Sequence, residues 1–76
     1  MTNPRAAQFV ADSVNIRTRA RATGDKTVAG SMYDQINQVP PGSLSQTDWA
    51  TVCETARANG DHHLADMATD KLRGNR

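Results

Sequence analysis

Hydrophobic and polar positions along this chain follow the period of an α-helix. Apolar or small residues recur every three or four positions, and no segment shows the alternation typical of a strand. The positions expected to face a core are Ala6, Phe9, Val10, Ser13, Val14, Ile16, Ala20, Val28, Ala29, Met32, Tyr33, Ile36, Trp49, Val52, Cys53, Ala56, Leu64, Ala65, Ala68 and Leu72. The pattern predicts an all-α fold of four helices.

Helix stop signals divide this pattern into two hairpins. The segments 23–25 and 59–61 each place a glycine, suited to a left-handed helix end, before an aspartate that can cap the next helix. The segment 40–42 reads Pro-Pro-Gly and ends the second helix, because the residue before a proline avoids helical backbone angles. We therefore expect one domain over 1–76, with hairpin 1 at about 4–39, a linker at 40–45 and hairpin 2 at about 46–73.

An internal repeat relates the two hairpins. A shift of 36 residues places Gly24 on Gly60. It also matches Ala20, Arg21, Ala22, Asp25, Ala29 and Asp34 with Ala56, Arg57, Ala58, Asp61, Ala65 and Asp70. A single hairpin leaves one apolar face uncovered, and a stacked neighbour can cover it. A duplicated hairpin is therefore the physical explanation of the repeat.

The duplicated hairpin resembles the tetratricopeptide repeat family over roughly residues 10–76. The resemblance begins with a bulky residue early in a first helix, Trp49, and with turn glycines followed by aspartate, Gly24-Asp25 and Gly60-Asp61. A small alanine stands five residues after each glycine, at Ala29 and Ala65. An aromatic residue follows the first of these alanines, at Tyr33, and a proline closes the first repeat, at Pro41. The chain departs from the family in its 36-residue period, against about 34, and in Arg17 and Cys53, which replace the usual first-helix glycine. A generic alanine-rich four-helix bundle is the alternative.

Composition and charge narrow the classes of function. The net charge of +1 does not indicate a general nucleic-acid or membrane binder. The chain has one Phe, one Trp and one Tyr, so its core is thin, and a homodimer or a bound partner could add burial. No apolar run approaches the roughly 18 residues of a membrane helix, and the start lacks a signal-peptide core. We expect a complete, cytoplasmic protein without a membrane segment.

The sequence offers no constellation for catalysis or for a metal. His62 and His63 are adjacent on a helix and point about 100° apart, so they cannot jointly hold one ion. Cys53 lies on an apolar face without a basic neighbour, which indicates a buried structural thiol rather than a nucleophile. No phosphate-binding glycine loop or nucleophile elbow occurs. We predict no enzymatic activity, no catalytic or metal-binding residue and no cofactor.

Arginines on the first helix of each hairpin are the most distinctive charged feature. Arg17 and Arg21 are four residues apart and share a helix face, and Arg57 is the repeat equivalent of Arg21. Equivalent first-helix positions of stacked hairpins line the same concave groove. We therefore predict a protein-protein interaction module that binds a protein partner through a groove lined by Arg17, Arg21, Glu54 and Arg57.

Such a module suits an adaptor, an inhibitor or a regulator, and its small size alone suggests a phage or plasmid gene. The alternative is a nucleic-acid-binding regulator that uses Arg17, Arg19 and Arg21 on phosphates, although the net charge and the missing aromatic platform speak against it. A third alternative is self-association that completes the core. The arginines could also form a solvated face with local pairs to Asp25 or Glu54.

Overall fold

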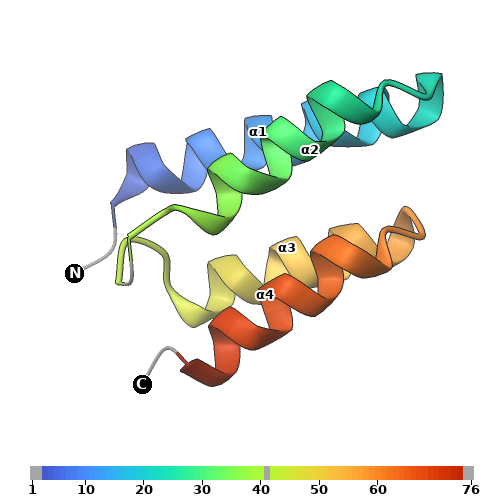
Figure 1. Ribbon diagram of the computed structural model, residues 1–76. Helices are drawn as coiled ribbons and strands as arrows, with labels where there is room; N and C mark the ends of the chain where they lie inside the picture. Colours follow the sequence, from blue (N-terminus) through green and yellow to red (C-terminus); the bar gives the residue numbers. More distant parts are fainter. Residues whose placement is uncertain (1–2, 41, 75–76) are drawn as a thin grey trace.

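The fold is an antiparallel arrangement of helices in two hairpins. A computed structural model describes residues 3–40 and 42–74, and within them the chain forms α1 (Pro4–Thr23), α2 (Lys26–Asn37), α3 (Gln46–Ala58) and α4 (His62–Gly74) (Figure 1). The described residues contain no strand. Helix α1 packs along α2, and α3 packs along α4. The prediction of an all-α fold built from two hairpins is confirmed.

The turns within the two hairpins have the same geometry. Gly24 and Gly60 adopt left-handed backbone angles, with φ of 79° and 70°. The aspartate after each glycine donates its backbone N–H to the carbonyl oxygen five residues earlier, at 2.8 Å in both turns. Its side chain accepts a hydrogen bond from the backbone N–H three residues later, at 3.1 Å in one turn and 3.2 Å in the other. Both glycine ends and both aspartate caps are as the sequence predicts.

Capping also fixes where α1 and α3 begin. The side chain of Asn3 accepts a hydrogen bond from the backbone N–H of Arg5. The hydroxyl of Ser45 accepts from the backbone N–H of Asp48, whose carboxylate accepts in return from the backbone N–H of Ser45. Both helix starts therefore have partners for N–H groups that the helix itself leaves unpaired.

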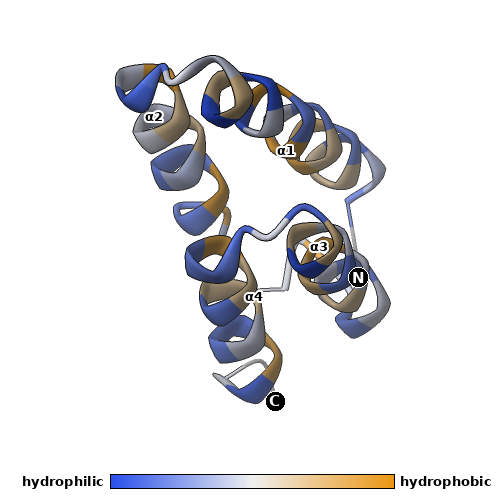
Figure 2. Ribbon diagram, turned by 90° about the vertical axis from the view of Figure 1, so that its right-hand side faces the viewer, coloured by the Kyte–Doolittle hydropathy of each residue, from blue (hydrophilic) through white to orange (hydrophobic). Residues whose placement is uncertain are grey.

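The second hairpin stacks on the first with its helices in the same order. Helix α1 lies over α3, and α2 lies over α4 (Figures 1 and 2). The two Gly-Asp turns lie at one end of the molecule, whereas the start of α1, the end of α4 and the linker lie at the other end (Figure 1). In the described part of the chain, no helix combines the length and the apolar character that crossing a membrane requires.

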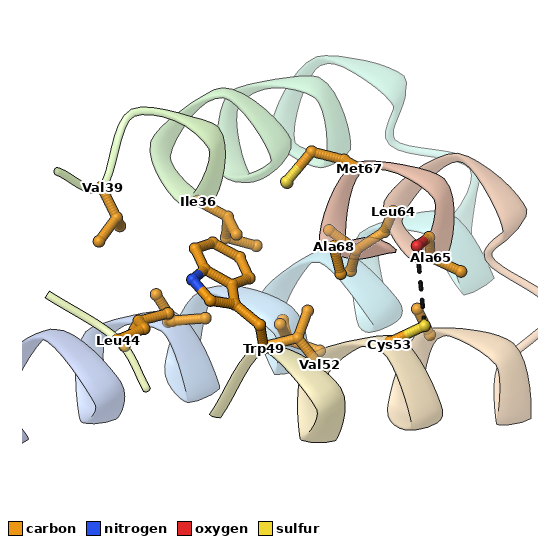
Figure 3. Close-up of a cluster of buried hydrophobic side chains, with 13 residues drawn as sticks. Ile36, Val39, Leu44, Trp49, Val52, Cys53, Leu64, Ala65, Met67 and Ala68 are labelled. Carbon is orange, nitrogen blue, oxygen red and sulfur yellow. Dashed lines mark hydrogen bonds between the residues drawn. The ribbon is translucent and has the colours of Figure 1, made fainter. Parts of the chain in front are cut away.

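The core lies between the two hairpins. Trp49 is 4% exposed and points from α3 toward Ile36 of α2, with Leu44 and Val52 beside it (Figure 3). Helix α1 adds Val10 and Val14 to the same cluster, and α4 adds Leu64, Ala65, Met67 and Ala68. The prediction that Trp49 belongs to the core is confirmed.

Two residues of α1 that the periodicity assigned to the core are not in it. Phe9 and Ile16 are each 46% exposed. Arg17, expected on the surface, is only 6% exposed. The apolar stripe of α1 is wide, and hairpin 2 covers only one side of it. The stripe therefore leaves Phe9 and Ile16 on an uncovered edge.

Candidate functional site

Arg17 connects the two hairpins through a buried ion pair. Its Nε donates to Asp61 Oδ2 at 2.7 Å and its Nη2 to Asp61 Oδ1 at 3.1 Å, a bidentate geometry. Its Nη1 donates to the backbone oxygen of Ala29 at 2.7 Å, and its guanidinium carbon lies 5.3 Å from the centre of the Tyr33 ring. All three guanidinium nitrogens are therefore engaged within the protein, so Arg17 acts as a connection between hairpins rather than as part of an exposed surface.

Asp61 serves both as a helix cap and as the acceptor of this ion pair. It is 2% exposed, its carboxylate accepts from the backbone N–H of Leu64, and Arg21 Nη1 lies 3.8 Å from its Oδ2. Burial by itself raises the pKa of Asp61, but the hydrogen bonds from Arg17 and Leu64 and the charges of both arginines outweigh burial. The pKa of Asp61 is therefore below its ordinary value, and the carboxylate stays charged.

Cys53 stands at the position of hairpin 2 that corresponds to Arg17 in hairpin 1. The predicted burial of Cys53 is confirmed. Its thiol lies 3.8 Å from the backbone oxygen of Ala65, the repeat equivalent of Ala29 (Figure 3). It also lies 3.4 Å from the hydroxyl of Thr69. The same inward position thus holds a long cation in one hairpin and a short thiol in the other, and only the cation reaches across to the neighbouring hairpin.

The other three residues of the predicted site lie on the surface. Arg21 Nη2 lies 3.5 Å from the backbone oxygen of Gly60, so its guanidinium rests against the α3–α4 turn. Glu54 and Arg57 are exposed, and neither forms an ion pair with another residue that the structure describes. Arg21 and Arg57 therefore lie near the C-terminal ends of α1 and α3, at the end of the molecule that holds the two turns (Figure 1). Arg17 does not share their surface because it is buried.

A groove runs between α1 and α3, the first helices of the two hairpins. Its volume is about 200 Å³, and Val10, Val14 and Val52 contribute to its apolar lining. Its remaining residues on the two helices include Ala7, Ala11, Asn15, Thr51 and Thr55. These side chains are small, so the two helices leave a trough between them. The groove occurs between the helices where stacking of the hairpins predicted one, but small residues line it instead of the predicted arginines.

Two polar side chains on the groove, Asn15 and Thr55, have no side-chain partner among the described residues. Neither the amide of Asn15 nor the hydroxyl of Thr55 makes a side-chain hydrogen bond to any other described residue. Asp48 also lines the groove, but its carboxylate accepts from the backbone N–H of Ser45. The groove thus combines an apolar lining with a small number of polar groups.

Sequence reasoning missed these lining residues, although a signal for them exists. Ala7, Ala11 and Asn15 are spaced by four residues, as are Thr51 and Thr55, so each set follows one side of its helix. Two stripes of small residues on the first helices of stacked hairpins indicate a groove. The arginines drew attention because charge is easier to recognise than a missing side chain.

The histidines do not form a metal site with other described residues. Both are exposed, and the His63 ring stacks on Tyr33 with ring centres 4.3 Å apart and planes 11° apart. Within residues 3–40 and 42–74, no group of three or more His, Cys, Asp or Glu side chains could hold a metal ion. His63 instead contributes to the contact between α4 and α2.

Comparison with known proteins adds no further identification. No protein-family model, no curated protein and no solved structure matches the chain.

Proposed function

We propose that the chain is a small, non-enzymatic protein-protein interaction module, and that it binds a partner segment in the groove between α1 and α3. The observation that carries this proposal is the trough between the first helices of both hairpins, which has walls of small side chains and the buried Val10, Val14 and Val52 as its floor. A stacked hairpin protein that holds a partner in this way would act as an adaptor, an inhibitor or a regulator. The resemblance to tetratricopeptide repeats supports the same surface.

The size of the groove favours side chains of a protein over a whole small molecule. Small-molecule sites usually enclose about 300–1,000 Å³, whereas this groove offers about 200 Å³. Such a space suits aliphatic side chains presented by a segment that lies along the two helices. Asn15 and Thr55 can hydrogen-bond to the backbone or the polar side chains of that segment.

Charge suggests how the partner segment would be oriented. Arg21 and Arg57 lie near the C-terminal ends of α1 and α3. A guanidinium binds carboxylates through a bidentate fork. We therefore expect the partner to carry an acidic residue at the end that meets Arg57, which forms no ion pair with another described residue, whereas Arg21 already lies 3.8 Å from Asp61 Oδ2.

Nucleic-acid binding, the alternative function, has less support. Arg17, the first residue of the proposed phosphate-binding cluster, is buried and paired with Asp61. Arg21 lies near the same carboxylate. Only Arg19 of that cluster is exposed without an ion pair to another described residue. One such cation is a weak basis for binding to a phosphate backbone.

The proposal can be tested by filling the groove. Ala11→Trp and Asn15→Trp place a bulky ring at exposed positions of the groove wall, and Asn37→Trp places the same ring on α2, outside the groove, as the matched control. The tagged protein would capture partners from a nuclease-treated lysate at about 0.5 M salt, where exposed charges are strongly screened. We expect one stoichiometric protein with the wild type and with Asn37→Trp, and at least a tenfold loss of that protein with the two groove variants.

Two results would contradict the proposal. Equal capture by all four proteins would place the binding surface outside the groove. Capture that disappears with nuclease or with salt would favour nucleic-acid binding through Arg19 and its neighbours, because phosphate contacts weaken steeply as salt rises.

A further inference from the structure

Hairpin 1 has an apolar face that hairpin 2 does not cover. On α1, Phe9 and Ile16 are both 46% exposed and lie two helical turns apart, so they share one side of the helix. On α2, Val28 and Met32 lie one turn apart and are half-buried. We call these four residues, together with Asp25, the outer face of hairpin 1. None of them lines the groove between α1 and α3.

The internal repeat shows what covers the corresponding face of hairpin 2. The repeat places Ile16, Val28 and Met32 on Val52, Leu64 and Ala68. These three residues of hairpin 2 are buried, and they belong to one cluster with Val10 and Val14 of α1 and Ile36 of α2. The face of hairpin 2 that corresponds to the outer face of hairpin 1 is therefore covered by a helical hairpin.

The aspartates that cap α2 and α4 also differ in whether another hairpin covers them. Asp61 caps α4 and also accepts the bidentate bond from Arg17 of the covering hairpin. Asp25 caps α2 in the same way, because its carboxylate accepts a hydrogen bond from the backbone N–H of Val28. Asp25 is nevertheless exposed and forms no ion pair with any described residue. The outer face of hairpin 1 thus presents aliphatic side chains and the Asp25 carboxylate. In hairpin 2, the equivalent side chains and the Asp61 carboxylate receive Arg17 of hairpin 1.

We propose that the outer face of hairpin 1 is a docking site for a helical hairpin of a partner protein, which stacks on it as hairpin 1 stacks on hairpin 2. The partner hairpin would cover Ile16, Val28 and Met32 with aliphatic side chains and donate an arginine to Asp25. This surface is separate from the groove, so the chain has two binding surfaces.

A second copy of this chain does not offer the matching surface. The side of hairpin 1 that covers hairpin 2, with Val10, Val14 and Arg17, is buried within the molecule. The corresponding positions of hairpin 2 are Gln46, Ala50 and Cys53, which provide neither the bulky aliphatic side chains nor the arginine. In this head-to-tail stacking the occupant is therefore not a second copy of the chain.

The experiment supplies a hairpin of known sequence to the outer face. A second copy of residues 3–45 is fused ahead of the full chain through a flexible glycine-serine linker of about ten residues. Its Val10, Val14 and Arg17 are the surface that already covers hairpin 2. We expect a single unfolding transition whose midpoint is at least about 5 °C above that of the natural chain, because each stacked hairpin adds an interface.

Point variants show whether the added hairpin occupies the outer face. Ile16→Arg in the receiving hairpin should remove the increase in midpoint, whereas in the natural chain it should change little because Ile16 is half-exposed there. Asp25→Asn keeps an oxygen for the helix cap. A double-mutant cycle combines Asp25→Asn in the receiving hairpin with Arg17→Met in the added copy. We expect the effect of the double variant on the unfolding equilibrium constant to differ about tenfold from the product of the two single effects.

Either of two results would overturn the proposal. The fusion could unfold at the midpoint of the natural chain, with no effect of Ile16→Arg or Asp25→Asn on that midpoint, which would show that the outer face does not accept a hairpin. Sedimentation of the natural chain could instead reveal a dimer that Ile16→Arg dissociates. The occupant would then be a second copy, and the assignment to a partner protein would be wrong.

Discussion

At the scale of single residues, the ion pair between Arg17 and Asp61 spans the contact between the two hairpins. The two side chains come from positions 44 residues apart, and both are buried. A buried ion pair contributes little net stability compared with apolar packing, but removing one partner leaves an uncompensated charge in the interior. We therefore expect the pair to fix the relative position of the hairpins more than it adds to the free energy of unfolding.

Replacing Arg17 alone should be strongly destabilising. Arg17→Met leaves Asp61 buried without its bidentate partner, and we expect the free energy of unfolding to fall by about 3 kcal/mol in a urea titration. Arg57→Met, at the exposed arginine, should change it by less than about 0.5 kcal/mol. If Arg17→Met and Arg57→Met proved equally mild, the ion pair would have no part in joining the hairpins.

The double variant Arg17→Met with Asp61→Asn separates the charge from the helix cap. The amide oxygen of Asn can still cap α4 by accepting from the backbone N–H of Leu64. No charge is then buried, so the double variant should be more stable than Arg17→Met alone.

The lowered pKa of Asp61 makes stability depend on pH in the acid range. Because the carboxylate is more acidic in the folded than in the unfolded chain, its contribution is present above the unfolded-state value of about 3.9. The contribution is lost as pH falls through the lower pKa of the folded state. Urea titrations between pH 6 and pH 2 should show this loss, and Asp61→Asn should show a shallower acid slope. An unchanged slope would mean that other carboxylates cause the acid sensitivity.

At the scale of elements, the hairpin turns depend on backbone conformation alone. A Cβ added at Gly24, Gly30 or Gly60 would meet no heavy atom within 4 Å. Gly24 and Gly60 have positive φ, whereas Gly30 lies in the regular part of α2. Any effect of an alanine at these positions therefore reports backbone preference without a steric clash.

Alanine substitutions at these glycines should have opposite effects. Gly60→Ala forces a side chain into the left-handed region and should cost about 1–2 kcal/mol. Gly30→Ala removes a flexible residue from an exposed helix position and should stabilise the chain by about 0.5–1 kcal/mol. Thermal unfolding followed by circular dichroism measures both. Destabilisation by both substitutions would indicate that Gly30 has a role outside the helix.

At the scale of the whole molecule, neither hairpin has a core of its own. The buried cluster draws on α1, α2, the linker, α3 and α4, and Trp49 of hairpin 2 packs beside Ile36 of hairpin 1 (Figure 3). Each hairpin therefore depends on the other for the burial of its apolar side chains. Such mutual dependence favours a single cooperative unfolding transition.

Trp49 can report this cooperativity because it is the only tryptophan of the chain. We expect its fluorescence and the helical circular dichroism signal to change at the same urea concentration, within error. Trp49 is buried between the hairpins, so its emission should shift to longer wavelength when they separate. Helical signal that persists after the fluorescence change would show that one hairpin survives without the other.

Local features of this chain could be predicted from the sequence because each depends on neighbours along the chain. The helices follow from the spacing of apolar residues, their ends from glycine, proline and capping residues, and the two turns from the repeated Gly-Asp pair. The burial of Trp49 and Cys53 also followed, since both lie in the middle of an apolar stripe.

Tertiary structure alone decided which side of each helix is covered. Periodicity predicts that α1 has an apolar stripe, but the position of hairpin 2 determines that Val10 and Val14 are buried while Phe9 and Ile16 stay exposed. The same stacking brings Arg17 to Asp61, a pairing that no local pattern encodes. The groove and the outer face also arise from stacking, because both depend on contacts between residues far apart in the sequence.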